Sequence, residues 1–153
     1  MNLPTDFKEL LEAFARESVE FAVVGGYAVA FHARPRATKD LDILLDGSPE
    51  NLERAANALE QFGAPRIVVS SVRSLGETEV VFMGQPPLRI DFLRTIDGVN
   101  TTPLLGRSVR TTWSGVPVRV IGLDDLIENK RAAGRPQDRI DVEVLEKVRR
   151  ARG

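Results

Sequence analysis

The sequence contains no cysteine and only one histidine, His32. Disulfide bridges, thiolate zinc sites and a cysteine nucleophile are therefore excluded, and so are metal sites built from several histidines. Any metal ion that this chain holds must be bound through oxygen atoms. Carboxylates are the side chains that supply such ligands, and hard divalent cations prefer them.

Long apolar runs and an excess of one charge are also missing. No stretch approaches the roughly 18 continuous apolar residues that a membrane span needs. Residues 1–6 have neither the basic region nor the apolar core of an export signal, which predicts a cytoplasmic protein with no membrane association. The 21 Lys and Arg nearly balance the 22 Asp and Glu, for a net charge of −1. This balance disfavours duplex nucleic acid as a partner, because such binding usually shows as a basic face.

What is present is an ordinary globular composition. The 153 residues, 42% of them hydrophobic, are enough for one domain over 1–153 with a real hydrophobic core. Apolar periodicity and Gly and Pro signals predict helices at about 6–17, 27–32, 49–62, 123–133 and from about 137. They predict strands at about 21–24, 40–45, 66–69, 77–82, 88–93, 108–112 and 116–121. The middle of the chain is therefore expected to form a sheet.

Two aspartates, Asp40 and Asp42, open one of the predicted strands. At this spacing both side chains leave the same face of the strand. Two carboxylates held so close repel each other unless a cation lies between them, and their oxygens suit Mg²⁺ or Mn²⁺. The alternative for this pair alone is a polar strand face exposed to solvent.

A third carboxylate, Asp91, lies on another predicted strand. Leu88, Ile90 and Phe92 share one face of that segment, so Asp91 points to the other. Three acidic groups on one sheet face are what two-metal phosphoryl transfer needs. Taken alone, Asp91 is equally compatible with a solvent-facing strand position.

Candidate phosphate contacts precede the acidic pair. Gly25 and Gly26 follow a strand and begin a predicted helix, a geometry that lets the backbone N–H groups approach a phosphate closely. Arg36 and Thr38 stand on a basic loop just before Asp40 and are candidates to contact phosphates or the acceptor. The alternatives are a tight turn without a ligand and a solvated loop.

Lys130 is a further candidate, because it falls on the apolar stripe of its predicted helix, seven residues after Leu123 and three after Ile127. One interpretation is that its ammonium group reaches into the cleft and neutralises phosphate charge. The alternative is a stem packed on the core with the ammonium group in water. Asp141 shares an apolar stripe in the same way, and we interpret it as a structural partner of Arg135 or Lys130.

Two of these motifs carry a family resemblance. The run from Val23 to Ile43 resembles the signature of the polymerase β-like nucleotidyltransferase superfamily, an apolar residue, Gly-Gly, a spacer and then Asp-apolar-Asp-apolar, here with thirteen residues between Gly26 and Asp40. The string Arg-Ala-Thr-Lys-Asp-Leu-Asp at 36–42 is similar to the form found in small bacterial AbiEii-like nucleotidyltransferases, some of which act as toxins or sit beside toxin–antitoxin partners. The segment 123–141 also looks like the tail of those small domains.

The resemblance implies an α/β (α+β) nucleotidyltransferase fold, with a mixed sheet flanked by helices and C-terminal helices from about residue 123 packed on the core. It implies that Gly25 and Gly26 lie near the triphosphate and that Asp40 and Asp42 bind both metal ions. Asp91 is then the third ligand and activates the acceptor hydroxyl. The implied reaction moves a nucleoside monophosphate from a nucleoside triphosphate to that hydroxyl and releases pyrophosphate.

Other functions stay open. The chain is compatible with a catalytically silent nucleotide-binding or antitoxin-like regulatory domain, and with a metal-dependent phosphohydrolase that uses the same carboxylates. AbiEii-like toxins carry a larger C-terminal region, which predicts that acceptor binding here is either incomplete or supplied by a partner. A cognate toxin or antitoxin is a candidate partner. RNA, a protein and a small molecule all remain candidate acceptors, and a homodimer is compatible with the sequence.

Overall fold

The computed structural model of the chain describes residues 2–35, 38, 40–85 and 88–153. This described part forms seven helices and six strands. In chain order they are α1 (Thr5–Arg16), β1 (Phe21–Val24), α2 (Gly25–His32), β2 (Asp40–Leu45), α3 (Pro49–Phe62), α4 (Arg66–Arg73), β3 (Val80–Met83), β4 (Arg89–Leu93), α5 (Thr101–Arg107), β5 (Val109–Trp113), β6 (Val116–Val120), α6 (Leu123–Ala133) and α7 (Pro136–Arg152).

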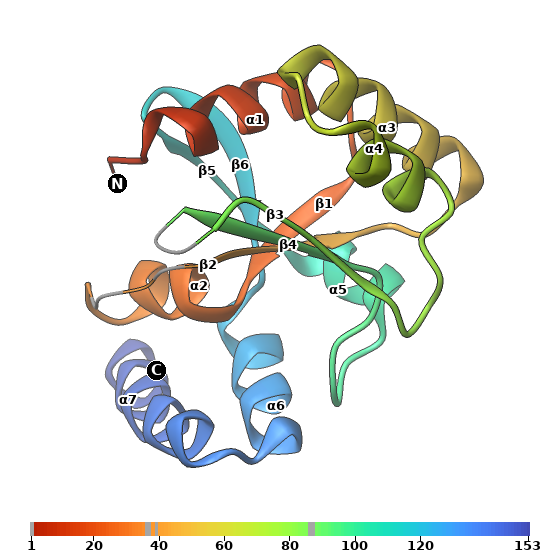
Figure 1. Cartoon of the computed structure of the whole chain (residues 1–153). Helices are drawn as coiled ribbons and strands as arrows, with labels where there is room; N and C mark the ends of the chain where they lie inside the picture. The colour runs from red at the N-terminus through yellow and green to blue at the C-terminus, as the bar shows by residue number, and fades with distance from the viewer. Residues whose placement is uncertain (1, 36–37, 39, 86–87) are drawn as a thin grey trace.

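The six strands form one mixed sheet in the order β3-β4-β2-β1-β6-β5. The neighbours β2 and β4 are parallel, as are β1 and β6, and the other neighbours are antiparallel. Helices α1, α3 and α4 lie on one side of the sheet, and α2, α6 and α7 lie on the other (Figure 1). The predicted fold class, a mixed sheet flanked by helices, is confirmed.

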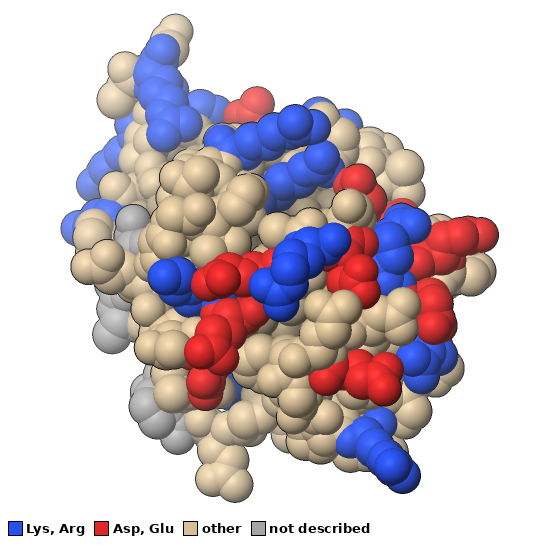
Figure 2. All heavy atoms as spheres, turned by 90° about the horizontal axis from the view of Figure 1, so that it is seen from above, with Lys and Arg blue, Asp and Glu red and all other residues tan. Residues whose placement is uncertain are grey.

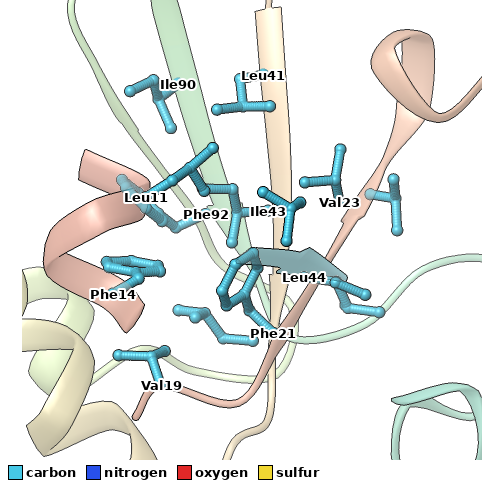
Figure 3. Close-up of a cluster of buried hydrophobic side chains, with 14 of the residues drawn as sticks. Leu11, Phe14, Val19, Phe21, Val23, Leu41, Ile43, Leu44, Ile90 and Phe92 are labelled. Carbon is cyan, nitrogen blue, oxygen red and sulfur yellow. The ribbon is translucent and has the colours of Figure 1, made fainter. Parts of the chain in front are cut away.

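The main core lies between the sheet and α1. The apolar spacing of α1 buries Phe7, Leu10, Leu11 and Phe14. Of these, Leu11 and Phe14 point toward the buried side chains of β2 and β4, which are Leu41, Ile43, Ile90 and Phe92 (Figure 3). The Phe14 ring packs against Phe21 and Phe92, with centroids 5.4 and 6.1 Å apart. Because strand side chains alternate between faces, burying these residues sends their neighbours Asp42 and Asp91 to the opposite face.

The ends of α3 follow the local signals in its sequence. Ser48 caps the helix by accepting a hydrogen bond from the backbone N–H of Asn51, and Pro49 occupies the first turn. Gly63 ends the helix in the left-handed conformation, with φ of 93°. The predicted helix at 49–62 is confirmed.

One predicted strand, at 66–69, is wrong: these residues begin helix α4. The β-branched run Ile67-Val68-Val69 suggested a strand, but Val68, Val69 and Val72 are buried at helical spacing while Ile67 stays 72% exposed. Packing of this stripe overrides the strand propensity of the individual residues. Helix α5 is also absent from the sequence prediction, which left 101–107 without an element.

Charges of both signs share the surface above α1 and α3. Figure 2 shows this side, where lysine and arginine side chains lie next to aspartate and glutamate across the centre. One such contact joins Arg73 on α4 to Glu53 on α3, at 2.9 Å. Of the helices in the described part of the chain, none is both long and apolar enough to cross a membrane.

The position of Phe14 gives a test of this core. Replacing Phe14 with alanine removes a fully buried ring that joins α1 to two strands, and we expect the free energy of unfolding to fall by about 3–5 kcal/mol. Urea unfolding followed by circular dichroism measures it. Ile67→Ala is the matched control, because its side chain is exposed, and it should change stability by no more than about 0.5 kcal/mol. Equal effects of the two variants would contradict the assigned core.

Candidate active site

Asp42 and Asp91 lie side by side on adjacent parallel strands. They are direct register partners in the pairing of β2 with β4, and both side chains are half-buried. Neighbouring strands are about 4.8 Å apart, so the two carboxylates lie next to each other on one face of the sheet. Both line a cleft of about 270 Å³ on the face opposite α1. Two residues far apart in the sequence are thus brought together.

The two C-terminal helices form one wall of this cleft. Asn129, Lys130 and Ala133 come from α6, and Asp138 comes from α7. The sheet, the first residue of α2 and the segment after β4 supply the rest of the described lining, which comprises Val24, Gly25, Val80, Leu93, Thr95, Ile96 and Asp97, with Arg135 just before α7. Four strands and three helices, α2, α6 and α7, therefore contribute to the cleft.

Gly25 brings the start of α2 directly against Asp42. Its φ is +70°, and a Cβ at this position would lie 2.1 Å from Oδ2 of Asp42. Only glycine combines this backbone conformation with such a close approach. The Asp42 carboxylate consequently lies beside the N-terminal end of α2, where backbone N–H groups lack helical partners. Gly26 is half-buried as the second residue of this helix and is not part of the described cleft lining.

The surroundings of Asp42 disfavour its negative charge. Burial first, and then the nearby charges of Asp91 and Asp40, raise the pKa of Asp42 from 3.8 to about 7, against the opposing effect of Lys130 and Arg89. A carboxyl group with this environment either keeps its proton or attracts a cation. The cleft is therefore a place where positive charge is stabilised.

Arg89 is the cation that meets these carboxylates in the structure. Its Nε and a terminal guanidinium nitrogen donate hydrogen bonds to the two carboxylate oxygens of Asp91, at 2.8 and 3.1 Å. The hydrogen bond to Asp91 comes first among the causes that raise the pKa of Arg89, and the charges of Asp40 and Asp42 add to it. The guanidinium group thus balances part of the charge of all three aspartates.

Asp40 lies at the margin of this group. It is the first residue of β2, is half-buried, and pairs in register with Arg89. It is not among the described cleft-lining residues, and within the described ranges no three His, Asp or Glu side chains are gathered closely enough to hold a metal ion. The structure brings Asp42 and Asp91 together directly, and it relates Asp40 to them through charge.

Lys130 is buried, only 6% exposed, and lines the cleft. Its Nζ lies 3.2 Å from Asp138 and 3.3 Å from Asp141. The ammonium group therefore does not extend into bulk water, and Asp141 is its structural partner, as predicted. Asp138 also accepts hydrogen bonds from the backbone N–H and Nε of Arg135, at 3.1 and 2.7 Å. Burial alone would raise the pKa of Asp138, but the hydrogen bonds from Arg135 and Lys130 hold it below its usual value.

The family follows from the whole length of the chain. The family model described as "Nucleotidyl transferase of unknown function (DUF2204)" matches residues 4–152. The chain belongs to this family. It is a nucleotidyl transferase, as the acidic motif and its glycines predict. No protein with a curated description matches its sequence.

Solved structures of other nucleotidyltransferases share the fold of this transferase. The antibiotic-resistance factor ANT(2″)-Ia, in complex with adenylyl-2″-tobramycin, is similar with a TM-score of 0.60 and 16% identity, over 94% of this chain and 90% of that one. The lincosamide adenylyltransferase LnuA bound to lincomycin has a TM-score of 0.60 and 12% identity, over 96% of this chain and 98% of that one. A Thermotoga maritima protein described as a nucleotidyltransferase has a TM-score of 0.59 and 14% identity, over 92% of this chain and 88% of that one. At these identities the likeness establishes the fold alone.

Sequence reasoning missed two residues of the transferase's site: Arg89, which binds the cleft residue Asp91, and Asp138, which lines the cleft. Arg89 stands two positions before Asp91 on the same strand, so the period of two already placed both on one face. Asp138 is the third residue of a helix that begins with Pro136, a position where acidic residues are favoured. Of the predicted phosphate contacts, Arg36 lies outside the described residues. Thr38 is half-buried and is not part of the described cleft lining.

The raised pKa of Asp42 predicts a pH-dependent stability for the metal-free transferase. The folded state binds this proton more tightly than the unfolded chain, so the stabilisation is fully present below about pH 4 and is lost as the pH rises through about 7. From pH 4 to pH 8, Asp42→Asn should gain stability relative to the wild type, by up to about 4 kcal/mol for a shift of about three pKa units.

Urea unfolding with a chelator, repeated across this pH range, measures the difference. Glu143→Gln removes an exposed carboxylate of α7 instead, and this control should follow the wild type. If the free energies of unfolding of Asp42→Asn and the wild type differ by the same amount at every pH, the cleft does not destabilise the ionised carboxylate.

Gly25 allows a second test by comparison with another glycine. Gly25→Ala and Gly115→Ala both place a Cβ at positive φ, +70° and +79°, but nothing lies within 4 Å of the new atom at Gly115. We expect about 1 kcal/mol of destabilisation at Gly115 and clearly more at Gly25, where the Asp42 carboxylate must also move. Thermal and urea unfolding compare the two variants. Equal losses would mean that the close approach of Gly25 to Asp42 has no energetic consequence.

Proposed function

We propose that the protein is a metal-dependent nucleotidyltransferase that moves a nucleoside monophosphate from a nucleoside triphosphate to an acceptor hydroxyl. The observation that carries this proposal is the pairing of Asp42 with Asp91 in a cleft closed by Gly25. Family membership supports the reaction class. In this reaction the acceptor oxygen forms a bond to the α-phosphorus, the bond from that phosphorus to the bridging oxygen breaks, and pyrophosphate leaves.

Mg²⁺ or Mn²⁺ is the cofactor that suits the chemistry of these carboxylate donors, although Asp40 lies at the margin of the Asp42 and Asp91 pair in this structure. Asp40, Asp42 and Asp91 would hold it, because carboxylate oxygens are its preferred ligands and these three already repel one another's charge. When bound, the metal lowers the pKa of the attacking hydroxyl and offsets charge on the leaving oxygens. A divalent cation there would take over the charge balance that Arg89 provides in this structure.

The protein's own groups bind and orient the substrates. Backbone N–H groups at Gly25 and Gly26, at the N-terminal end of α2, would hold the triphosphate. Lys130 would add positive charge at the phosphates from α6, held in position by Asp138 and Asp141. Arg36 and Thr38 would contact the same phosphates from the loop before β2. Asp91 would accept the proton of the acceptor hydroxyl.

The donor and the biological setting are inferred more indirectly. The fold neighbours carry an adenylylated aminoglycoside and lincomycin, which supports ATP as the donor and makes a small molecule one candidate acceptor beside RNA and protein. The string at 36–42 supports an AbiEii-like subtype and a toxin–antitoxin partner. These inferences rest on fold likeness and on one motif, respectively.

A second candidate function is a nucleotide-binding regulatory domain without transfer activity. The observation that favours it is the double hydrogen bond from Arg89, which occupies both oxygens of Asp91 in this structure. If Arg89 never leaves, Asp91 can neither bind a metal nor accept a proton. Transfer of a labelled nucleotide decides between the two candidates.

We expect wild-type protein with Mg²⁺ and α-³²P-labelled ATP to label a component of a cell extract, and Asp42→Asn to lower this transfer by at least about a thousandfold. Circular dichroism should show that the variant keeps its fold, since asparagine has the same shape. A chelator should abolish transfer and added Mn²⁺ should restore it. Glu143→Gln is the control for loss of a carboxylate remote from the cleft. Full transfer by Asp42→Asn would refute its assignment as a metal ligand.

A further inference from the structure

Two apolar side chains of β3 stand exposed beside the catalytic carboxylates. β3 is an edge strand of the sheet (Figure 1), yet Val80 is 52% and Phe82 is 59% exposed. Exposed aromatic and branched residues on an edge strand favour unwanted association and are usually avoided. Their exposure here indicates a surface that is covered during function.

Strand pairing fixes where these side chains lie. Phe82 is the register partner of Asp91, and Val80 is the partner of Leu93. Directly opposed residues of an antiparallel pair have their Cα atoms about 4.5–5.5 Å apart and point to the same face. Phe82 is therefore the immediate neighbour of Asp91, while Val80 lines the cleft itself.

Arg89 joins this apolar surface to the acidic site. Its guanidinium carbon lies 4.8 Å from the centre of the Phe82 ring, and the same group donates both hydrogen bonds to Asp91. A cation over an aromatic face is attracted by the ring. Phe82, Arg89 and Asp91 thus form one connected unit across β3 and β4, and a ligand that packs on Phe82 lies within a side chain's length of the Asp91 carboxylate.

The charges around the cleft restrict the kind of molecule that can pack there. Four carboxylates and two cations are among the described lining residues. Both cations, Lys130 and Arg135, are already bound to Asp138. Asp97, one of the four carboxylates, is exposed. A polyanion such as RNA would meet repulsion on this side, whereas a neutral or cationic compound would not.

We propose that Val80 and Phe82 form the acceptor subsite, and that the acceptor is a small, uncharged or cationic hydroxyl compound with an apolar or aromatic ring. The ring packs against Phe82, and its hydroxyl faces Asp91. This proposal rests on the proposed transferase function and adds the class of acceptor. Phe82 and Val80 determine acceptor specificity, and they take no part in binding the triphosphate.

The first experiment identifies the acceptor class. Wild-type protein is incubated with α-³²P-labelled ATP, Mg²⁺ and, separately, the small-molecule, RNA and protein fractions of a cell extract, with lincomycin and tobramycin as defined probes. Label should enter the small-molecule fraction and be retained on a reversed-phase resin. Label in RNA or protein overturns the acceptor subsite and leaves the transferase function standing. Label in no sample contradicts the transferase proposal and removes the basis of the subsite with it.

The second experiment tests Phe82 with the labelled acceptor from the first. Phe82→Ala should raise the KM for that acceptor by about tenfold or more, because a ring contact is lost, and should leave the KM for ATP unchanged. Phe82→Leu keeps an apolar surface and should restore most of the affinity. Ile67→Ala, at an exposed apolar position on α4 across the sheet, is the control and should leave both constants unchanged.

Comparing the KM for the acceptor with the KM for ATP separates a loss of acceptor specificity from structural damage. A Phe82→Ala protein with altered folding would lose ATP binding and thermal stability as well, and Phe82→Leu would then report on the subsite. An unchanged KM for the acceptor in both Phe82 variants would overturn the proposal, even if transfer itself is fully active.

Discussion

The parallel pairing of β2 with β4 is the constraint on which the rest of the structure depends. Its register places Asp42 beside Asp91 and Ile43 beside Phe92. One face of this pair is apolar and is held against α1, so the burial of Leu41, Ile43, Ile90 and Phe92 also fixes the aspartates on the other face (Figure 3). A shift of either strand by one residue would exchange the two faces. The packing that forms the core therefore also places the aspartates of the site side by side.

The charges in the cleft are balanced in two separate groups of residues, one on the sheet and one on the helices. Near the sheet, Arg89 neutralises part of the charge of the aspartates, and the pKa of Asp42 remains raised because it is buried beside like charges. Near the helices, Lys130 is held by Asp138 and Asp141. These two ion pairs hold the Lys130 ammonium group at the helix wall of the cleft. The sheet side still favours an added cation.

The sequence predicted most elements because their signals are local. Ser48, Pro49 and Gly63 mark the two ends of α3 through caps that need no distant contact. The strand at 66–69 is wrong for the opposite reason. Its residues have strand propensity, but packing of Val68, Val69 and Val72 at helical spacing decides their conformation. Helix α5 begins with two threonines and a proline, and burial of Leu104 and Leu105 gives it its place.

By itself, the sequence determined that any metal site must use oxygen ligands, that Asp40 and Asp42 leave one face of a strand, and that glycines precede them. These follow from composition and from the period of two. The tertiary structure decided which groups meet. Asp42 faces Asp91 across 49 residues of sequence, Lys130 contacts Asp138 and Asp141, and Phe82 stands opposite Asp91. Strand order and helix packing create these neighbours, because contacts between distant segments depend on how complete elements bury their apolar faces together.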